Sequence, residues 1–408
     1  MIYRLEILHS DCHHVAVRPS DSTPFCGSLM LYSSLLAVPL RLSPPIRDAG
    51  DDETNVKGGQ KLSRHPKISI AMTTYNGERH LLEQLDSLAS QESLPCELQI
   101  GDDGSTDGTK DIVSAFAASA PFPVTFCRNE RRLGYGENFL QTAARCCGDW
   151  VAFCDQDDIW MPEKLSVVGS AIENSDELLL VVHNCTVVDE TGVRLPNIVL
   201  SHFRDSSFPT LRLPATWSCA GFRQIFHRSI IENFDSSKRL GSIFRFKSET
   251  GIDSLPHDSW IPFIASMTGS VRSVAAPLVQ YRRHLSNATI VSGNLQGADA
   301  FKNHSSEYRY VAKWHKSAAD ALIHAAEQPN DPKIQSARRR LQAENDWLLQ
   351  RASLYETKSP TRRLAFLVRL ISTGGYTLSW SMTLKSLVKD AIYTLVGNRL
   401  MMFSNMAR

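Results

Sequence analysis

The stretch ISIAMTTYNGERHLLEQLDSLA, residues 68–89, decides the fold of this chain. Ile68, Ile70 and Met72 predict a short buried strand, which ends in the polar turn TTYNG. After this turn, leucines recur at helical spacing, namely at Leu81, Leu82, Leu85 and Leu88. A buried strand that leads through a short turn into a helix is the beginning of a parallel α/β sheet.

The same pattern continues toward the C-terminus. Further strands are predicted at 97–100, 124–127 and 150–154, with polar turns and apolar residues at helical spacing between them. Pro162 then predicts the first turn of another helix. The sequence therefore predicts an α/β fold, in which a Rossmann-like, mostly parallel sheet has helices on both faces and is followed by a C-terminal helical region.

Length and composition restrict the function. The 408 residues exceed what one hydrophobic core usually organises, so one large domain with additions, or two domains, is expected. With 44 Lys and Arg against 43 Asp and Glu, the formal net charge is +1, which excludes a generally basic nucleic-acid binder. Mean hydropathy is -0.20, and without a run of about 20 apolar residues the sequence has no obvious membrane span.

Three regions differ in composition. Residues 43–67 are rich in proline, glycine and charge, so we expect residues 1–65 to be a disordered N-terminal extension. Residues 66–295 carry the strands and helices described above, and we expect them to form the α/β domain. Residues 296–408 are predicted to be helical, and basic and amphipathic from about residue 358.

The last part of the chain is strongly basic. After Leu354, eight Lys and Arg residues face two acidic residues, Glu356 and Asp390, with apolar residues between them. A basic amphipathic helix of this kind suits the surface of an anionic membrane. The alternative is an ordinary helix that docks on the catalytic domain and exposes a basic face to water.

The cysteines and the N-terminus indicate an intracellular protein. Nine cysteines are scattered from Cys12 to Cys219 without a CxxC pair, which favours reduced thiols over a disulfide framework. The first residues do not resemble a signal peptide, because Glu6, His9 and Asp11 interrupt the apolar run that one would need. We therefore expect the protein in the cytoplasm.

Acidic residues directly follow two of the predicted strands. Asp102 and Asp103 come after the second strand, and Asp155, Asp157 and Asp158 come after the fourth. Ligands of open α/β sheets bind at the carboxyl ends of the strands, where these side chains would meet. Carboxylates at such range repel one another, so Mg²⁺ or Mn²⁺ bridged to a substrate diphosphate would compensate their charge. The alternative is that the first acidic stretch only caps the next helix.

Three motifs occur in a defined order, TTYNG at 73–77, DDGSTDGT at 102–109 and DQDDIW at 155–160. Together they resemble family 2 glycosyltransferases of the GT-A fold, especially the rhamnosyltransferase-like branch of polysaccharide assembly. The resemblance extends over residues 66–290 and implies a GT-A domain at 66–295 that binds a nucleotide sugar at the strand ends.

The resemblance also implies roles for individual residues. The residues implied for the nucleotide sugar are Thr74, Tyr75, Asn76, Asp102 and Asp103 for base and ribose, Asn138 and either Arg282 or Arg283 for the diphosphate, and Asp155 for ribose or sugar. Asp157 would ligate the metal ion, and His284 would ligate the metal or contact phosphate. Asp258, in the motif HDSW, would be the base that deprotonates the acceptor hydroxyl.

The implied activity is that of an inverting, metal-dependent glycosyltransferase in cell-surface polysaccharide synthesis. It would transfer a sugar from a nucleotide-diphosphate sugar to a glycan or lipid-linked glycan, and in the branch named above this sugar is rhamnose. If the basic tail binds lipid, the reaction would take place at the cytoplasmic face of the plasma membrane. The alternatives are a nucleotidyltransferase on a related scaffold and a non-catalytic sugar-nucleotide-binding protein. The sequence has no GxxxxGK[ST] motif and no GxGxxG after a strand, which argues against a P-loop NTPase and against nicotinamide dinucleotides.

Overall fold

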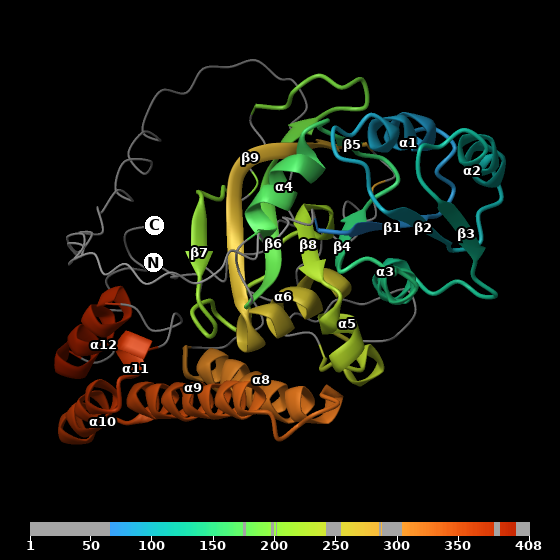
Figure 1. Cartoon of the computed structure of the whole chain (residues 1–408). Coiled ribbons are helices and arrows are strands. Elements are labelled where there is room, and N and C mark those ends of the chain that lie inside the picture. The colour runs from blue at the N-terminus through green and yellow to red at the C-terminus, as the bar shows by residue number, and fades with distance from the viewer. Residues whose placement is uncertain are drawn as a thin grey trace, which may run out of the picture. The chain divides into compact units, whose positions relative to one another are not determined.

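We describe the protein from a computed structural model (Figure 1). The structure describes the following residues: 66–173, 177–196, 200, 202–241, 254–284, 287, 304–378 and 384–396. The N-terminal extension that the sequence predicts to be disordered, residues 1–65, lies outside the described residues.

The first four strands form a parallel sheet, as the sequence predicts. They pair in the order β3-β2-β1-β4, and all three pairs are parallel. A helix follows each of the first three strands, so consecutive strands are joined by helical crossovers. These elements are β1 (Ile68–Thr74), α1 (Leu81–Ala89), β2 (Glu97–Asp102), α2 (Thr109–Ala117), β3 (Val124–Arg128), α3 (Tyr135–Ala144) and β4 (Trp150–Cys154).

The second half of the sheet is mixed. β8 runs antiparallel between β4 and β6, β6 is parallel to β9, and β5 and β7 pair antiparallel with β9. The sequence does not predict this half, because the four-residue strand β8 pairs with strands that are distant in the chain. These elements are β5 (Ile159–Trp160), α4 (Lys164–Ile172), β6 (Leu178–Val188), β7 (Ser206–Phe208), β8 (Gln224–His227), α5 (Ser229–Asn233), α6 (His257–Thr268) and β9 (Ser270–Arg282).

One helix begins later than the sequence predicts. Pro162 is expected in the first turn of a helix, but α4 begins at Lys164. The reason is that Trp160 is still part of a strand, β5, and pairs with Val279 of β9. The chain therefore needs a turn before the helix can begin, and Pro162 lies in that turn.

Helices cover both faces of the sheet, which confirms the predicted α/β class. Ile70 and Met72 of β1 belong to the core under α1, α2 and α4, whereas Ala71 points to the opposite core, which α3 and α6 cover. Figure 1 shows α1 and α3 on opposite sides of β1 and β2. Both faces of the parallel half of the sheet are therefore covered, and β4 consists entirely of apolar residues.

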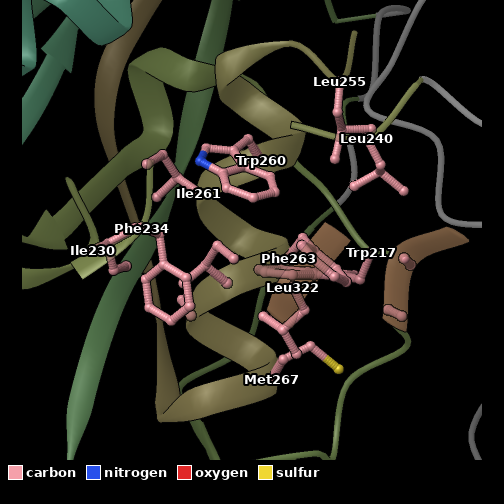
Figure 2. Packing of buried hydrophobic residues seen from close by; sticks show 14 of the residues in the cluster. Trp217, Ile230, Phe234, Leu240, Leu255, Trp260, Ile261, Phe263, Met267 and Leu322 are labelled. Carbon is pink, nitrogen blue, oxygen red and sulfur yellow. The ribbon is translucent and has the colours of Figure 1, made fainter. Parts of the chain in front are cut away.

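Helix α6 is buried on all sides. Trp260, Ile261 and Phe263 are 0% exposed, and Figure 2 shows them packed among residues of α5, α8 and the connecting loops. A helix that is apolar all round belongs in a core, and each large side chain buried there contributes roughly 1.5–3 kcal/mol. This packing fixes the N-terminus of α6, where Asp258 lies in the first turn.

The C-terminal region is helical, as predicted. α8 (His304–Ala325) and α9 (Pro332–Glu356) form a hairpin, and α9 also contacts α6. Three shorter helices follow, namely α10 (Pro360–Ser372), α11 (Gly375–Leu378) and α12 (Leu384–Val396). Figure 1 shows these three helices together at one end of α9. Within the part of the chain that the structure describes, no helix combines the length and the apolar character needed to cross a bilayer.

A buried carboxylate ties α12 to the rest of the C-terminal region. Asp390 is 0% exposed and accepts two hydrogen bonds from the Arg351 guanidinium of α9, from Nε at 2.7 Å and from Nη2 at 3.1 Å. The hydroxyls of Tyr355 and Tyr376 donate to the same carboxylate, each at 2.6 Å. A paired and fully hydrogen-bonded buried charge is costly to break, so Asp390 fixes the orientation of α12.

Removal of this carboxylate should detach the last helices. We expect Asp390→Ala to destabilise the packing of α10–α12 on α9 by about 3–5 kcal/mol, because it leaves Arg351 buried without its counter-charge. Hydrogen exchange of the α10 and α12 amides measures the effect. Asp346→Ala on the exposed side of α9 is the control and should leave exchange unchanged. Equal exchange in both variants would contradict the anchoring role of Asp390.

Candidate active site

The carboxyl ends of β1, β2 and β4 lie side by side at one edge of the sheet. Thr74 at the end of β1 is in register with Asp102 at the end of β2, and Met72 is in register with Cys154 at the end of β4. The loops after these three strands therefore start next to one another, as the sequence predicts. This edge is where open α/β sheets bind their ligands.

Asn76 links the first two of these loops. Its φ is 48°, a left-handed conformation that asparagine adopts more readily than most residues. Its N–H donates to Ser105 Oγ (2.9 Å), and its Oδ1 accepts from the N–H of Thr106 (2.9 Å). The loop after β1 thus holds the loop after β2 in place.

The carboxylate of Asp102 accepts hydrogen bonds from groups of the protein itself. It is 1% exposed, and its Oδ1 accepts from Thr74 Oγ1 at 2.8 Å and from the Ser105 hydroxyl. Its Oδ2 accepts from the N–H groups of Gly104 (3.2 Å) and Ser105 (2.9 Å). Asp102 and the buried Thr74 therefore lie at the predicted edge of the site, where they shape the loop.

Asp103 organises the next loop. Its Oδ1 accepts from the N–H of Leu133 (2.6 Å) and its Oδ2 from the N–H of Gly134 (2.8 Å). Behind it lies Asn138 of α3, which is 1% exposed and donates from Nδ2 to Gly101 O at 2.8 Å. Asn138 thus supports the strand end from inside the protein and does not present its amide to solvent.

Tyr75 is the exposed member of this group, with 39% of its surface accessible. Its backbone is clamped by Gln156, whose Oε1 accepts from Tyr75 N–H (2.9 Å) and whose Nε2 donates to Tyr75 O (3.2 Å). The guanidinium carbon of Arg132 lies 4.0 Å from the centre of the tyrosine ring. The loops after β1 and β4 are therefore joined directly, and Gly77 leaves room for this clamp, since a Cβ there would lie 2.3 Å from Gln156 Oε1.

The loop after β4 concentrates negative charge. Burial, followed by repulsion from Asp157 and Asp258, raises the pKa of Asp155 to about 7. Asp158 is 0% exposed, and burial followed by the same kind of repulsion raises its pKa well above the usual range. Asp158 Oδ1 accepts from Arg282 N–H (3.1 Å), while its Oδ2 is buried without a hydrogen-bond partner. The negative charges of Asp157 and Asp258 thus both act on Asp155.

Lys164 places a buried cation close to this cluster. It is 0% exposed, donates from Nζ to Phe222 O (3.1 Å), and lies with Nζ 3.4 Å from the ring centre of Trp160. Burial lowers the pKa of Lys164 to about 7, although Cys154, Asp158 and Asp155 oppose this shift. The sequence does not distinguish Lys164 as a site residue, because a lysine in an amphipathic helix usually points to solvent. Trp160 is 2% exposed and forms part of the core.

Asp157 and His284 meet in the structure although 127 residues separate them. His284 Nε2 lies 2.8 Å from Asp157 Oδ2, and Asn287 Nδ2 donates to the same oxygen at 3.3 Å. The ring of His80, in the turn before α1, lies 5.0 Å from the ring of His284, and its Nε2 is buried without a hydrogen-bond partner. His80 and Asn287 were missed from the sequence because neither belongs to a motif.

These residues fit a divalent cation that is shared with a substrate. A carboxylate oxygen of Asp157 is a suitable donor for Mg²⁺ or Mn²⁺, and the imidazole of His284 would add a nitrogen donor, which Mn²⁺ accepts more readily than Mg²⁺. Burial, and after it repulsion from Asp157 and Asp258, raises the pKa of Asp155, and a bound cation would oppose both effects. Among the described residues, no three His, Cys, Asp or Glu side chains are arranged to hold an ion by themselves. Mg²⁺ is commonly held by one or two carboxylates together with substrate phosphates, so such a site needs no third protein ligand.

The two arginines after β9 have different environments. Arg282 is 3% exposed and donates from Nε to Asp157 O (3.0 Å) and from Nη1 to Glu190 O (2.8 Å), so it braces the acidic loop. Arg283 is partly exposed, donates from Nη1 to Tyr281 OH (3.1 Å), and has its N–H bound to Val188 O (2.8 Å). Of the two, Arg283 is the one that solvent or a phosphate can reach.

Asp258 lies in the first turn of α6, and its charge acts on Asp155 of the acidic loop. Burial raises the pKa of its carboxyl group to about 6, although Ser259 Oγ donates to Oδ1 at 3.2 Å and opposes this shift. Its backbone carbonyl accepts from Gln224 Nε2 (2.9 Å), which ties the helix start to β8. A carboxylate with a pKa near neutrality is suited to accept and release a proton.

His257, the residue before Asp258, is packed in the core. Its ring stacks on Phe139 with centres 4.3 Å apart, and burial lowers its pKa to about 3. Gly221, in the short 3₁₀ helix Gly221–Arg223, lies against this ring, and a Cβ there would lie 2.4 Å from His257 Nε2. His257 is therefore neutral and packed, and it sets the position of the helix start.

The sequence of this region was compared with known proteins. The model of the family "Glycosyl transferase family 2" matches residues 69–234, which include the loops after β1, β2 and β4. The chain contains a glycosyl transferase family 2 domain. Together with the mixed sheet and its covering helices, this match identifies the fold as the GT-A type that the sequence predicts.

Several curated relatives carry related sequences. Glycosyltransferase alr2836 of Nostoc sp. is 34% identical over 125 residues, which are 30% of this chain and 38% of that protein. The abequosyltransferase RfbV of Salmonella typhimurium is 30% identical over 132 residues, or 32% of this chain and 40% of its own length. The protein Rv1520 of Mycobacterium tuberculosis is 26% identical over 220 residues, which are 53% of this chain and 59% of that protein. This chain thus spans about 40–60% of these relatives.

Solved structures with a similar arrangement are more distant in sequence. Residues 1–349 of TarS from S. aureus, in complex with UDP-GlcNAc, align at a TM-score of 0.46 and 17% identity, over 75% of this chain and 80% of that one. The mannosyltransferase PcManGT from Pyrobaculum calidifontis, in complex with GDP-Man and Mn²⁺, aligns at a TM-score of 0.37 and 20% identity. The alignment covers 81% of this chain and 88% of that one.

The contact between Gly221 and His257 can be tested. We expect Gly221→Ala to destabilise the protein by about 1–3 kcal/mol, because the added methyl group would have to displace the packed imidazole ring. Urea denaturation measures the change in unfolding free energy. Gly136→Ala is the matched control, since a Cβ at Gly136 meets no atom closer than 3.8 Å. If both variants unfold alike, the packing role of His257 is wrong.

Proposed function

We propose that this protein is an inverting glycosyltransferase that moves a sugar from a nucleotide-diphosphate sugar to an acceptor hydroxyl. The observation that carries the proposal is Asp258, a carboxyl group with its pKa raised to about 6 by burial, within electrostatic reach of Asp155 at the carboxyl end of β4. The match to family 2 glycosyltransferases over residues 69–234 supports the reaction class.

In this mechanism Asp258 acts as the base. Its carboxylate takes the proton of the acceptor hydroxyl while the acceptor oxygen forms a bond to the anomeric carbon. The bond from that carbon to the diphosphate oxygen breaks, and the nucleoside diphosphate leaves with the electron pair. A single displacement inverts the anomeric configuration. Gln224 and His257 hold the helix start, so the carboxylate meets the acceptor in a fixed position.

The acidic loop would hold the donor. Asp157 and His284 would hold Mg²⁺ or Mn²⁺, which when bound would supply positive charge next to the leaving diphosphate. Arg283 is accessible for a phosphate contact, and Asp155 would contact ribose or sugar. Tyr75 offers an exposed ring for the nucleotide base, on the loop that Asn76 and Gln156 help to fix.

The donor sugar and the acceptor are further parts of the proposal. Rhamnose is the first donor to test, because the order of the three sequence motifs resembles the rhamnosyltransferase-like branch. A glycan or lipid-linked glycan of cell-surface polysaccharide is the proposed acceptor, and the cytoplasm or the cytoplasmic face of the plasma membrane is the proposed location. A panel of nucleotide sugars, scored by release of the nucleoside diphosphate, identifies the donor.

The pH dependence of turnover tests the role of Asp258. The base must be ionised, so below pH 6 we expect kcat/KM to fall about tenfold per pH unit, with a plateau above. Asp258→Asn should reduce kcat by about 10²–10⁴-fold. Ser259→Ala removes a hydrogen bond to the charged form, so it should shift the midpoint to higher pH. Near-normal turnover of Asp258→Asn would contradict the assignment.

Calorimetry with nucleoside diphosphates tests the donor site. We expect binding of UDP or dTDP to the wild-type protein to be at least about tenfold tighter with Mn²⁺ than without it, since the cation compensates both phosphate and carboxylate charge. Asp157→Asn should remove most of this difference, whereas Asp111→Asn on the exposed side of α2 should not. Binding without any dependence on metal would contradict the proposed site. Tight binding without sugar transfer would favour a non-catalytic binding protein.

A further inference from the structure

The exposed apolar surface of this protein is concentrated on two helices. Of the eleven large apolar side chains that are exposed in the described residues, six lie on α10 and α12. On each helix they are spaced at positions i, i+4 and i+7, which places them in one row along the helix. We call these rows the two apolar stripes: Leu364, Val368 and Ile371 on α10, and Val388, Ile392 and Leu395 on α12.

The stripes are separate from the faces that pack inside the protein. Leu367 and Leu370 of α10 and Tyr393 of α12 are at most 7% exposed and form a core with Trp347 of α9. By contrast, the residues of the two stripes are 48–82% exposed. A helix that merely docks on a domain has one apolar face and a polar outer face. Packing among the residues that the structure describes therefore does not account for the stripes.

The charges around the stripes have one sign. α10 contains no acidic residue, and its Arg362 and Arg369 are exposed. The acidic residue of α12, Asp390, is fully buried and neutralised by Arg351. Glu356, just before α10, is paired with Arg309 at 2.6 Å. Among the described residues of α10 and α12, the exposed charges next to the stripes are therefore the cations Arg362 and Arg369.

We propose that the two apolar stripes, together with Arg362 and Arg369, form a surface that binds anionic phospholipid bilayers. Each helix has 13 residues, too short to span a bilayer but sufficient to lie in its interface. The apolar side chains enter the acyl boundary while the guanidinium groups contact lipid phosphates. A second copy of the chain is a poorer occupant, because a twofold contact would place the cationic surfaces against each other.

The inner contacts of α12 keep this surface in place. Asp390 binds Arg351 of α9 and the hydroxyl of Tyr376 in α11, so the opposite face of α12 remains turned to solvent. Tyr393 adds a ring contact with Tyr355, with centres 4.3 Å apart. The stripe of α12 is therefore presented by a rigid support. The proposal does not rest on the glycosyltransferase activity, since lipid binding needs none of the acidic residues of the active site.

Vesicle flotation of the full chain tests the apolar part of the surface. We expect the wild-type protein to float with vesicles of phosphatidylcholine and about 30% phosphatidylglycerol. Leu364→Ser, Val368→Ser and Ile371→Ser combined should weaken the partition at least about tenfold, because these groups no longer enter the apolar boundary. The matched control combines Leu82→Ser, Leu94→Ser and Val193→Ser, at apolar positions of similar exposure elsewhere, and should bind like wild type.

A second pair of variants tests the charged part and does not alter any apolar side chain. Arg362→Gln with Arg369→Gln should lower binding to the anionic vesicles about tenfold or more and should reduce its dependence on salt. Lys110→Gln with Lys316→Gln removes two exposed charges elsewhere and should have little effect. Circular dichroism checks that each variant is folded.

Three results would overturn the proposal. Wild-type protein that stays unbound with anionic vesicles at low salt would exclude the surface. Equal binding by the stripe variant and its control would place the contact elsewhere. Sedimentation equilibrium that shows a dimer, which the stripe variant converts to monomer while vesicles are not bound, would assign the stripes to a second copy of the chain.

Discussion

The active site depends on the electrostatic cost of holding several carboxylates together at one edge of a buried sheet. Burial, and after it repulsion from Asp157 and Asp258, raises the pKa of Asp155 to about 7. Such a cluster persists only because its surroundings are rigid and partly compensate its charge. Arg282 binds the backbone of the acidic loop, Lys164 lies buried close by, and α6 is held in the core by large apolar side chains.

The same constraint explains why so many polar groups near the site bind the protein itself. Asp102 and Asp103 follow β2, as the sequence predicts, and both accept hydrogen bonds from loop N–H groups, while Asn138, predicted near the diphosphate, donates to the backbone of β2. A carboxylate at a turn satisfies several N–H groups that a tight loop would otherwise leave unpaired. The motif residues thus keep the loops in shape, and Tyr75, Asp155, Asp157 and Arg283 are left closer to solvent.

The sequence predicts which polar loops meet wherever a loop follows a strand directly. The convergence of Thr74, Asp102 and Asp155 follows from parallel strands whose carboxyl ends share an edge. Prediction from the sequence failed for His80, Asn287 and Lys164, which reach the site from a helix start, a loop after β9 and a buried helix face. Nothing in the local pattern distinguishes these residues from ordinary surface histidine, asparagine and lysine. In the C-terminal region, charge counting could not show that Asp390 and Glu356 are already paired.

The sequence by itself determined the α/β class, the parallel half of the sheet, the helical C-terminal region and the loops that carry the acidic motifs. These features depend on local periodicity and on short connections, which a linear sequence records. The tertiary structure alone decided the antiparallel half of the sheet, the meeting of Asp157 with His284, and which faces of α10 and α12 remain exposed. Each of these depends on contacts between segments far apart in the chain, so burial and pairing are settled only when the chain is packed.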